Sequence, residues 1–402
     1  MDFDVPAGNT LNLSALVGAC GPDHYACYSA HVRSLLLSSS MPKHKLCKSK
    51  SQCRRRSRWK ELRVGTDFSG LEAPILALRS MGLAIDHCFA CDNLPAAKLI
   101  SDYYFKPNKF FSDIRFRDNE SLPSVDLYVS GFPCRAWSHE GTRLGLDNNE
   151  SGDLALHSLL YIKQKRPVIV VLENVIPGNG EAVKFFEYLC EYIRGLGYIA
   201  DWHFANTRKY GLPQSRPRIW LVGILQNRLA HRFMLTRPVE GCIGIGDIVQ
   251  PLPQASWKRL PPKTRKRERA HVRKAYKKFA RSGIDIRNVP IVIDIAGSYP
   301  ERHASAAYYS PCLTRRHASE HSYWVSTKGG TMTVYEMALL QGITRDMLDP
   351  CKDLGMRPRA YASMLGDSMS LNVLCHVLSS ALYSAGFVDD SQRQKLLAKC
   401  GW

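Results

Sequence analysis

The chain has 402 residues, of which 45% are hydrophobic and 23% are charged, so it is long enough for two or three domains with substantial cores. It contains no run of about 18 apolar residues and no basic N-terminal segment ahead of a long apolar core, which argues against a membrane span and a secretory signal. We therefore expect an intracellular protein whose 13 cysteines are reduced thiols.

The net charge of +19 is concentrated in two segments. Residues 43–63 hold ten lysines or arginines against one acid, and residues 258–281 hold twelve against one, while the rest of the chain is close to neutral. Such clusters favour binding to a polyanion, most simply nucleic acid, because neutralised phosphates release counterions. The alternative is a solvated or nuclear-import run, such as P-P-K-T-R-K-R-E-R.

Residues 1–57 are predicted to form a basic, flexible extension, and ordered structure is predicted to begin at Leu62. A strand over Val64–Phe68 is followed by a tight turn at Ser69–Gly70 and by a helix from Glu72 to Met81. A glycine turn between a strand and a helix N-terminus can hold an anionic or nucleoside cofactor, because its backbone N–H groups approach the ligand closely.

Two acids stand at the ends of the next predicted strands. Asp92 follows a strand that begins at Ile85, where a carboxylate can accept from both ribose hydroxyls, although a helix cap is the alternative role. Asp113 ends a third strand, at a place where it could accept from an adenine amino group. Cys88 and Cys91 form a C-x-x-C pair, but no second pair stands at zinc-finger spacing, so we expect no metal.

The segment Val125–Trp137 reads V-D-L-Y-V-S-G-F-P-C-R-A-W and predicts a short buried strand that Gly131 and Pro133 stop abruptly. Cys134 is left at the end of this strand, where open α/β sheets place their chemistry, and it is therefore a candidate nucleophile. A buried structural thiol is the alternative for any isolated cysteine. The polar loop at 139–153 that follows is predicted to be a mobile lid.

A fifth strand over Pro167–Leu172 is almost wholly β-branched and is predicted to be central. It ends in Glu173, and a carboxylate at such a place is either desolvated or paired, which suits proton transfer. Arg216 and Arg218 alternate at the start of another strand, Ile219–Ile224, so their guanidiniums share one face. Facing Glu173 and a nucleotide they would be functional, whereas as surface ion-pair partners they would be unremarkable.

Between residues 226 and 330 the regular alternation of strands and helices stops, which predicts a smaller second domain. A helix is predicted over Arg265–Arg281, because one face gathers apolar side chains and the other gathers basic ones. The apolar face holds Val272, Ala275, Tyr276, Phe279 and Ala280, and the outward face holds Arg273, Lys274, Lys277, Lys278 and Arg281. After this domain the capping-box pair Thr333 and Glu336 predicts a new helix, and Leu371–Ala385 predicts an apolar one.

Taken in order, these strand ends resemble those of the DNA (cytosine-5)-methyltransferase family over roughly Arg63–Gly386. The specific motifs are G-F-P-C-R-A-W-S, E-N-V and Q-S-R-P-R. Weaker ones are F-S-G-L-E at Phe68, C-D-N at Asp92, S-D-I at Asp113, S-G-D-L at Ser151, S-P-C-L-T at Ser310, T-V-Y-E-M-A-L-L-Q-G at Thr333 and G-D-S-M-S-L-N-V-L at Gly366.

The resemblance implies an α/β fold class with a doubly wound, Rossmann-like class I methyltransferase sheet and a small target-recognition domain. It implies S-adenosyl-L-methionine as cofactor and duplex DNA with a flipped-out cytosine as partner, with no membrane and no metal. The enzyme would act as a monomer on DNA, in the nucleus of a eukaryote or otherwise in the cytoplasm or nucleoid. The implied boundaries are 58–225 for the catalytic domain, 226–330 for the recognition domain, 331–388 for a segment that returns to the catalytic domain, and 389–402 for a tail.

The resemblance also assigns roles to particular residues. Catalysis falls to Cys134, Glu173, Arg216 and Arg218. Cofactor binding falls to Phe68, Ser69, Gly70, Leu71, Asp92, Asn93, Asp113, Ile114, Leu154, Asp367 and Ser368. DNA binding falls to Gln214, Arg315 and Arg316, beside the outward residues Arg273, Lys274, Lys277 and Lys278.

In the implied chemistry the Cys134 thiolate adds to carbon-6 of cytosine, which makes carbon-5 nucleophilic toward the methyl donor. Glu173 protonates or hydrogen-bonds N3, while Arg218 holds O2 and Arg216 steers the DNA strand or Glu173. A base inside a duplex cannot meet this geometry, so the cytosine has to be flipped out.

The chain departs from the family pattern at several positions. Glu72 stands where the cofactor turn usually carries a glycine, Arg135 replaces a glutamine, Ser151 an arginine, Cys312 a threonine and Asp367 an asparagine. Two alternatives stay open. One is a cytosine-5 methyltransferase that acts on transfer RNA, which would typically show a C-F-T segment that this chain lacks. The other is a non-catalytic nucleic-acid-binding module on the same fold.

Overall fold

The computed structural model describes residues 61–133, 153–177, 180–236, 243–249, 258–296 and 305–401. The predictions for the extension 1–57, for Cys134 and Arg135, for Ser151 and for all of the lid except Asp153 lie outside these ranges. Within them, no helix is long and apolar enough to cross a membrane.

A seven-stranded sheet forms the larger part of the molecule, with the strand order β3-β2-β1-β4-β5-β7-β6. Every pairing is parallel except those of β7, which runs antiparallel to both β5 and β6. This sheet confirms the doubly wound class predicted from the sequence. Its strands are β1 (Leu62–Asp67), β2 (Ile85–Cys91), β3 (Phe110–Phe111), β4 (Leu127–Ser130), β5 (Ile169–Asn174), β6 (Tyr198–Asn206) and β7 (Pro217–Leu225).

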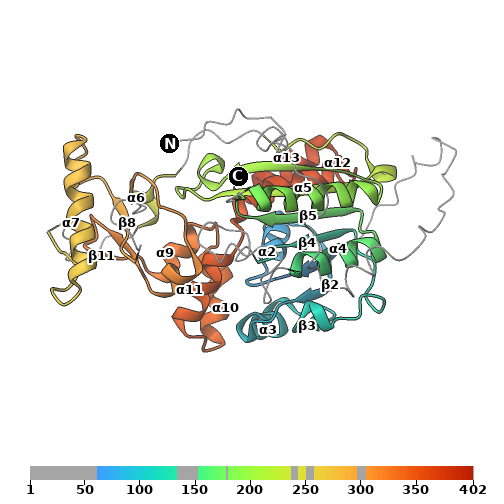
Figure 1. The fold of residues 1–402 in the computed structure, drawn as a ribbon, viewed down its shortest axis with the longest axis horizontal. Coiled ribbons are helices and arrows are strands. Elements are labelled where there is room, and N and C mark those ends of the chain that lie inside the picture. The colour runs from blue at the N-terminus through green and yellow to red at the C-terminus, as the bar shows by residue number, and fades with distance from the viewer. Residues whose placement is uncertain are drawn as a thin grey trace.

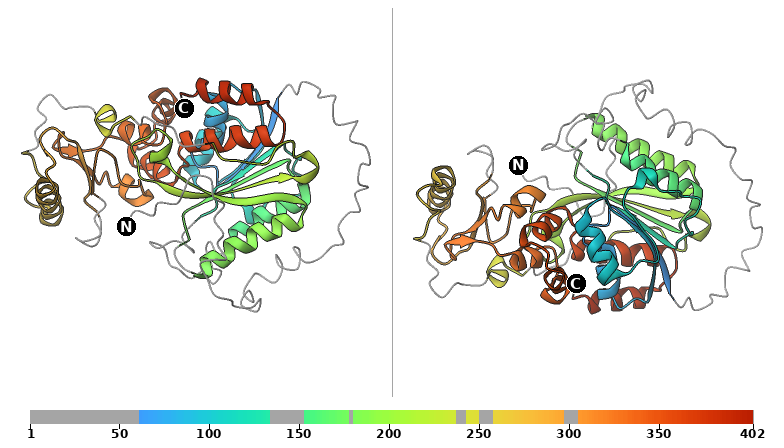
Figure 2. Two further views of the ribbon diagram at one scale, coloured as in Figure 1. Left: turned by 90° about the horizontal axis from the view of Figure 1, so that it is seen from above. Right: turned by 90° about the horizontal axis from the view of Figure 1, so that it is seen from below.

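Helices cover both faces of this sheet (Figure 2). One face packs against α2 (Ala73–Ser80), α3 (Pro95–Ile100) and α12 (Leu371–Ser384), and the other against α4 (Leu154–Lys165) and α5 (Gly180–Gly195). Because side chains alternate along a strand and both faces are covered, β5 is buried at every position and is continuously apolar over residues 169–172. The sequence therefore shows continuous apolar runs rather than alternation.

The C-terminal residues are ordered and helical. Predicted as a tail, they form α13 (Asp390–Lys399), which begins with a capping box between Asp389 and Gln392. Leu396 is buried in the same core cluster as α12, so α13 is a packed part of the larger lobe.

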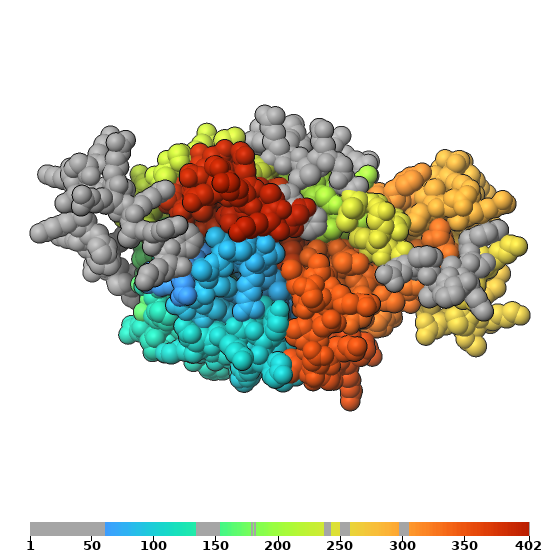
Figure 3. Space-filling view, turned by 180° about the vertical axis from the view of Figure 1, so that it is seen from behind, coloured from blue at the N-terminus to red at the C-terminus, as the bar shows by residue number. Residues whose placement is uncertain are grey.

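A smaller lobe projects from one end of the large sheet (Figures 1 and 3). Its antiparallel sheet has the order β11-β10-β8-β9. The strands are β8 (Ile291–Asp294), β9 (Ser305–Ala307), β10 (Tyr323–Val325) and β11 (Gly330–Thr331), and the short helix α6 (Ile245–Ile248) lies beside them. The long helix α7 (Lys266–Arg281) packs on this sheet through a small core of its own.

The prediction for α7 is confirmed in its bounds to within one residue and in most of its apolar face. Val272, Ala275, Tyr276 and Phe279 are buried against the sheet, and the Trp324 indole N–H donates to the Tyr276 hydroxyl at 3.2 Å. Ala280 was wrongly predicted to be part of this face, since it is exposed. The cause is geometric, because Ala280 lies past the edge of the narrow stripe that the sheet covers.

Four helices lie between the two sheets (Figure 1). They are α8 (Arg315–Ser319), α9 (Val334–Leu339), α10 (Arg345–Asp353) and α11 (Pro358–Asp367). The predicted start of α9 is confirmed, because Thr333 caps it and Glu336 completes the capping box. The carboxylate of Glu336 also binds the buried Lys328 ammonium at 2.7 Å, which ties the β10–β11 hairpin to α9.

Candidate active site

The strand order brings the chemistry to one edge of the large sheet. The parallel strands β1, β4 and β5 all end there, with Asp67 paired to Ser130. Because β7 is antiparallel, its first residues lie at the same edge, and Asn174 at the end of β5 pairs with Ile219. The side chains after β4 and β5 and those at the start of β7 therefore meet.

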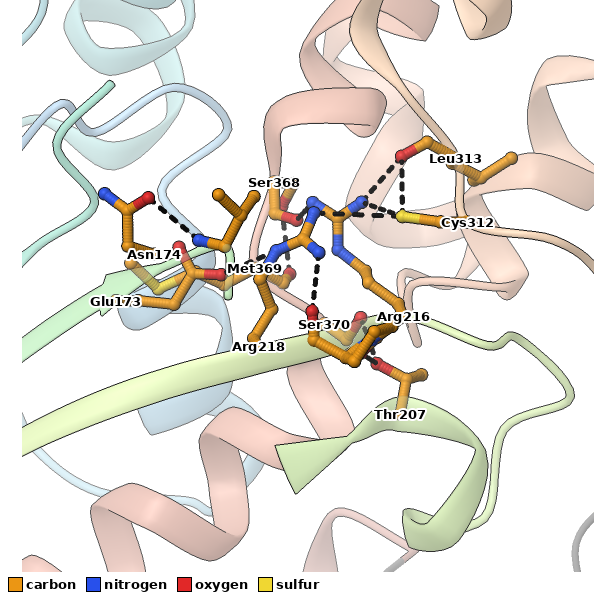
Figure 4. A network of polar contacts seen from close by, with 12 residues as sticks. Glu173, Asn174, Thr207, Arg216, Arg218, Cys312, Leu313, Ser368, Met369 and Ser370 are labelled. Atoms are coloured by element: carbon orange, nitrogen blue, oxygen red, sulfur yellow. Dashed lines mark hydrogen bonds and ion pairs between the residues drawn. The ribbon is translucent and has the colours of Figure 1, made fainter. Parts of the chain in front are cut away.

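Glu173 and Arg218 form an ion pair at this edge, with 3.1 Å between Glu173 Oε1 and Arg218 Nε (Figure 4). Both side chains are largely buried. Burial raises the pKa of Glu173, and the neighbouring charges of Arg218 and then Arg216 oppose this shift. The pair predicted from two distant sequence motifs is thus brought into direct contact.

The turn after β4 packs against the same carboxylate. The Asn174 side-chain amide donates to the Phe132 carbonyl at 3.0 Å, which ties the end of β5 to this turn. A Cβ added to Gly131 would lie 2.9 Å from Met369 Cε and 3.9 Å from Glu173 Oε2, so only glycine fits there without displacing a neighbour. The turn that leads to Cys134 therefore begins beside Glu173.

Arg216 lies in the cluster, and backbone carbonyls accept from both of its terminal nitrogens. Its guanidinium donates to the carbonyls of Leu313 at 2.7 Å, Gly366 at 3.1 Å and Ser368 at 2.7 Å (Figure 4). Only 2% of the residue is exposed, so in this structure it holds the chain together rather than reaching outward. Burial, and then the charge of Arg218, lower the pKa of Arg216.

Cys312 was noted in the sequence only as a departure. Its sulfur lies 3.5 Å from Arg216 Nη1 and 3.8 Å from Arg218 Nη2, beside the predicted catalytic arginines. The S-P-C-L-T motif marks this segment but not its contact with the arginines, because that contact depends on how the second domain returns to the first.

The predicted cofactor turn has an unusual backbone. Phe68, Gly70 and Glu72 all have left-handed φ values, of 54°, 51° and 55°. No atom lies within 4 Å of the point where a Gly70 Cβ would be, so the turn is open on that side. Asp92 accepts from the backbone N–H groups of Gly70 and Leu94, each at 2.8 Å, and burial raises its pKa.

An apolar cluster lies next to this turn. Ile114, Leu154 and Cys91 are buried together, with Phe68 and Phe111 packed against them. Three of these residues were predicted to bind the cofactor, and Cys91 and Phe111 were not. A flat aromatic base suits such a cluster, and the Asp92 carboxylate has lone pairs for ribose hydroxyls, so the residues present fit a nucleoside cofactor.

The other predicted cofactor residues lie in varied surroundings. Leu71 packs in the main core, Ser69 is buried and Asn93 is exposed. The Asp113 carboxylate accepts from the Arg115 backbone N–H at 2.9 Å, so part of its capacity is already used. At the end of α11, the Ser368 carbonyl accepts from Arg216, and the Asp367 carboxylate pairs with Arg315 at 3.3 Å.

Glu72, the most conspicuous departure from the family pattern, turns inward. Its carboxylate is buried, and the Thr66 hydroxyl lies 3.0 and 3.2 Å from its two oxygens. His87 Nε2 is 3.7 Å from Glu72 Oε1 and 3.2 Å from the same hydroxyl. Burial raises the pKa of Glu72 to about 8 and lowers that of His87 to about 4, so both groups are neutral near pH 6.

The residues predicted to bind DNA divide into two groups. Arg273, Lys274, Lys277 and Lys278 are exposed on α7, and Arg316 is exposed on α8 with Glu320 at 2.9 Å. The prediction for Gln214 conflicts with its full burial. Its amide donates to the Leu340 carbonyl at 2.7 Å and accepts from the Leu313 N–H at 2.9 Å, which leaves it unavailable to DNA in this structure.

The structure also shows the surroundings of the C-x-x-C pair that was considered as a zinc site. Cys88 and Cys91 are free, buried thiols of β2. Among the described residues, no three His, Cys, Asp or Glu side chains are grouped as a metal site.

A doubly wound sheet of this order, with an apolar cluster at its carboxyl edge, defines a class I methyltransferase fold. Residues 66–381 match the model of the C-5 cytosine-specific DNA methylase family, and the chain belongs to that family. Type II methyltransferase M.DsaV of Dactylococcopsis salina is 27% identical over 296 residues, which are 71% of this chain and 76% of that protein.

Other relatives match over shorter stretches. Type II methyltransferase M.Bsp6I of Bacillus sp. (strain RFL6) is 32% identical over 36% of this chain, and M2.ScrFI of Lactococcus lactis subsp. cremoris is 36% identical over 33% of it. These matches span 47% and 38% of the two relatives, less than half of either protein.

Solved structures share the fold at low identity. The S. pombe Dnmt2 methyltransferase superposes with a TM-score of 0.56 at 15% identity, covering 81% of this chain and 100% of that one. Entamoeba histolytica methyltransferase EhMeth gives a TM-score of 0.55 at 15% identity, with coverages of 81% and 98%. Both superpositions support the architecture described above.

Proposed function

We propose that this protein transfers a methyl group from S-adenosyl-L-methionine to carbon-5 of a cytosine in DNA. The observation that carries the proposal is the buried Glu173–Arg218 ion pair beside the turn that leads to Cys134. Membership of the C-5 cytosine-specific DNA methylase family supports cytosine as the base and DNA as the substrate.

The cofactor supplies an electrophilic methyl group on a sulfonium. The Cys134 thiolate adds to carbon-6 of cytosine while N3 takes a proton or hydrogen bond, and the electron pair at carbon-5 then bonds to the methyl carbon. Loss of the carbon-5 proton to a base and cleavage of the sulfur–carbon-6 bond return the thiolate. The products are 5-methylcytosine and S-adenosylhomocysteine.

Glu173 is the proposed partner of cytosine N3. Its raised pKa favours the protonated carboxyl group that can donate to N3 when the thiolate adds. Arg218, which holds Glu173 in place, is the proposed partner of the cytosine O2. Arg216 acts as a positioning residue, because its bonds to Leu313 and Ser368 fix the recognition-domain exit against β7.

The burial of Glu173 supports base flipping. A carboxylate with 7% of its residue surface exposed is out of reach of a base that stays stacked in a duplex, so the cytosine has to leave the helix, at a cost of a few kcal/mol. We propose that one copy of the enzyme acts on each site, with the duplex lying between the two lobes.

The cofactor would lie beside the turn at 68–71 and against the apolar side chains of Phe68, Phe111, Ile114 and Leu154. Asp92 would accept from the ribose hydroxyls, and Asp113 from the adenine amino group. These assignments fit the open space over Gly70 and the carboxylate beside it.

The test is tritiated methyl transfer from the cofactor to duplex DNA, with transfer RNA as the alternative acceptor and Cys134→Ala as the control. We expect label in DNA, none in transfer RNA and none with the variant. Label in transfer RNA alone would establish the rival substrate. Binding of DNA without any transfer would establish the non-catalytic alternative.

A further inference from the structure

A buried ion pair lies directly behind the proposed cofactor turn. Asp67 is the last residue of β1 and precedes Phe68. Its carboxylate accepts from both terminal nitrogens of Arg117, and the distance from Arg117 Nη2 to Asp67 Oδ2 is 3.0 Å. Neither side chain has any exposed surface. The Tyr128 hydroxyl donates to the same carboxylate at 2.5 Å, and Arg117 Nε donates to Asn119 Oδ1 at 2.9 Å, so these polar groups form a network inside the protein.

Arg117 is enclosed by aromatic rings as well as by its partner. Its guanidinium carbon lies 5.2 Å from the ring centre of Phe89, 5.9 Å from that of Phe111 and 5.6 Å from that of Tyr161. A Cβ at Gly65 would come within 2.4 Å of the Phe89 ring, so the glycine makes room for one of these rings. Burial opposes the charge of Arg117, but the Asp67 carboxylate outweighs it and the pKa of Arg117 is raised.

The network joins three segments that border the proposed active site. Asp67 leads into the turn at 68–71, and its backbone carbonyl also accepts from the Gly131 N–H at 3.4 Å, in the turn toward Cys134. Arg117 follows the short 3₁₀ helix Ile114–Phe116, which carries one wall of the apolar cluster. That wall has little other support from the sheet, because β3 is two residues long and pairs only with Ala90 and Cys91.

We propose that Asp67 and Arg117 are positioning residues that fix the width of the cofactor site before the cofactor binds. The ion pair sets the separation between the turn at 68–71 and the wall at 113–114, so the cluster is formed in the free enzyme. A preformed site binds more tightly because less ordering remains to be done on binding. The inference rests on the proposed function only for the identity of the cofactor.

The experiment uses the full chain without cofactor and then with S-adenosylhomocysteine. Arg117→Leu alone would leave a buried, unpaired carboxylate and could prevent folding, so the decisive variant is Asp67→Leu with Arg117→Leu, which removes both charges. Arg117→Lys keeps a charge but loses the two-pronged contact. The matched control is Arg63→Leu with Asp126→Leu, which removes a solvent-exposed pair at the opposite edge of the sheet, where β1 and β4 begin.

We expect hydrogen exchange over residues 110–117 to be faster in the cofactor-free double variant than in the wild type. The dissociation constant for S-adenosylhomocysteine, measured by calorimetry, should rise at least tenfold in both Arg117 variants and stay within twofold in the control. A double variant with wild-type melting temperature, exchange and affinity would overturn the inference. If the wild type itself does not bind S-adenosylhomocysteine, the proposed function fails, and the exchange comparison still tests the positioning role.

Discussion

Among single residues, Cys134 has the most demanding proposed role, since only a thiolate adds readily to carbon-6 of cytosine. Cys134→Ser should abolish methyl transfer, because a serine hydroxyl stays protonated at neutral pH whereas a thiolate is accessible. The measurement is tritium transfer to duplex DNA, with circular dichroism to show that the variant is folded. Cys400→Ser, a change at a partly exposed thiol after α13, is the matched control and should keep full activity. More than about a tenth of the activity left in Cys134→Ser would refute the nucleophile.

Glu72 makes the stability of the protein depend on pH. Its pKa is raised from an ordinary value near 4.5 to about 8, so between these pH values the native state holds a proton that the unfolded chain has lost. The free energy of unfolding should therefore fall as pH rises through this window, by up to about 1.4 kcal/mol per pH unit. His87 acts in the opposite sense, since its lowered pKa makes stability fall as pH drops from 6.5 toward 4.

Glu72→Gln removes the titratable carboxyl group but keeps the shape of the side chain and its neighbour Thr66. Urea unfolding at pH 4 to 9 should show the stability of the variant gaining on that of the wild type from about pH 4.5 to about pH 8, with a constant difference above that. Parallel stability curves for the two proteins would mean that the native carboxyl group titrates normally. The groups that face Glu72 are Thr66, Ser69, His87, Asp92 and Ser101, and all of them are unchanged in the comparison.

Secondary structure was largely predictable where local sequence decides it. The buried strands β1 and β5 and the helices α7 and α12 lie close to their predicted bounds, because apolar runs and glycines mark them. The antiparallel course of β7 was not predictable, because it depends on long-range pairing with β5 and β6. The contact of Arg218 with Glu173 follows from that pairing and not from spacing alone.

The residues of the candidate site were likewise predictable only where a local motif marks them. Asp92, Glu173 and Arg218 stand at the ends of recognisable strands, so their motifs identified them. The burial of Gln214 and the position of Cys312 depend on how 311–313 and 340–341 return to β7, which no local pattern reports. Arg117 was missed because it lies in an irregular segment, and only the fold brings it to Asp67.

Among the helices, α7 has the exposed basic surface that we expect to contact DNA phosphates. Arg273, Lys274, Lys277 and Lys278 are exposed, and within the described residues no carboxylate lies within ion-pair distance of them. Changing all four to Gln should weaken binding to every DNA sequence about equally, because phosphate contacts carry no sequence information. If all four make contacts, the slope of log K against log salt should flatten by roughly 3–4 units, at about 0.9 per contact.

The control changes four exposed lysines on other elements, Lys109, Lys352, Lys395 and Lys399, to Gln. It removes the same charge, so it separates an effect of net charge from one of α7 itself. An equal loss of slope in both variants would argue against a specific role for α7. Lost preference between target and scrambled DNA would mean that the helix reads bases.

In the whole molecule, the proposed catalytic edge lies where the two lobes meet. Arg216, just before β7, binds carbonyls before α8 and at the end of α11, and Arg315 on α8 pairs with Asp367. The proposed placement of DNA and the proposed catalytic geometry therefore share the same supports. The apolar cluster and turn proposed to hold the cofactor, in contrast, belong to the large sheet, its connecting turns and its helices.

The separation of the proposed DNA site from the proposed cofactor site can be tested at the buried pair of Lys328 and Glu336, which joins the small sheet to α9. Lys328→Met should lower the free energy of unfolding by about 3 kcal/mol, because it leaves a buried carboxylate without its partner. DNA binding should weaken along with it, while the calorimetric affinity for S-adenosylhomocysteine should stay unchanged. Adding Glu336→Gln should recover part of the stability, because the uncompensated charge is gone.

Lys98→Met is the matched control, because it breaks an exposed lysine–carboxylate pair with Asp102 at 2.6 Å and should cost less than about 1 kcal/mol. If Lys328→Met weakens cofactor and DNA binding by the same factor, the two lobes behave as one cooperative unit. The proposed cofactor site would then depend on the small lobe, although none of the described residues of that lobe lies in the apolar cluster beside the turn.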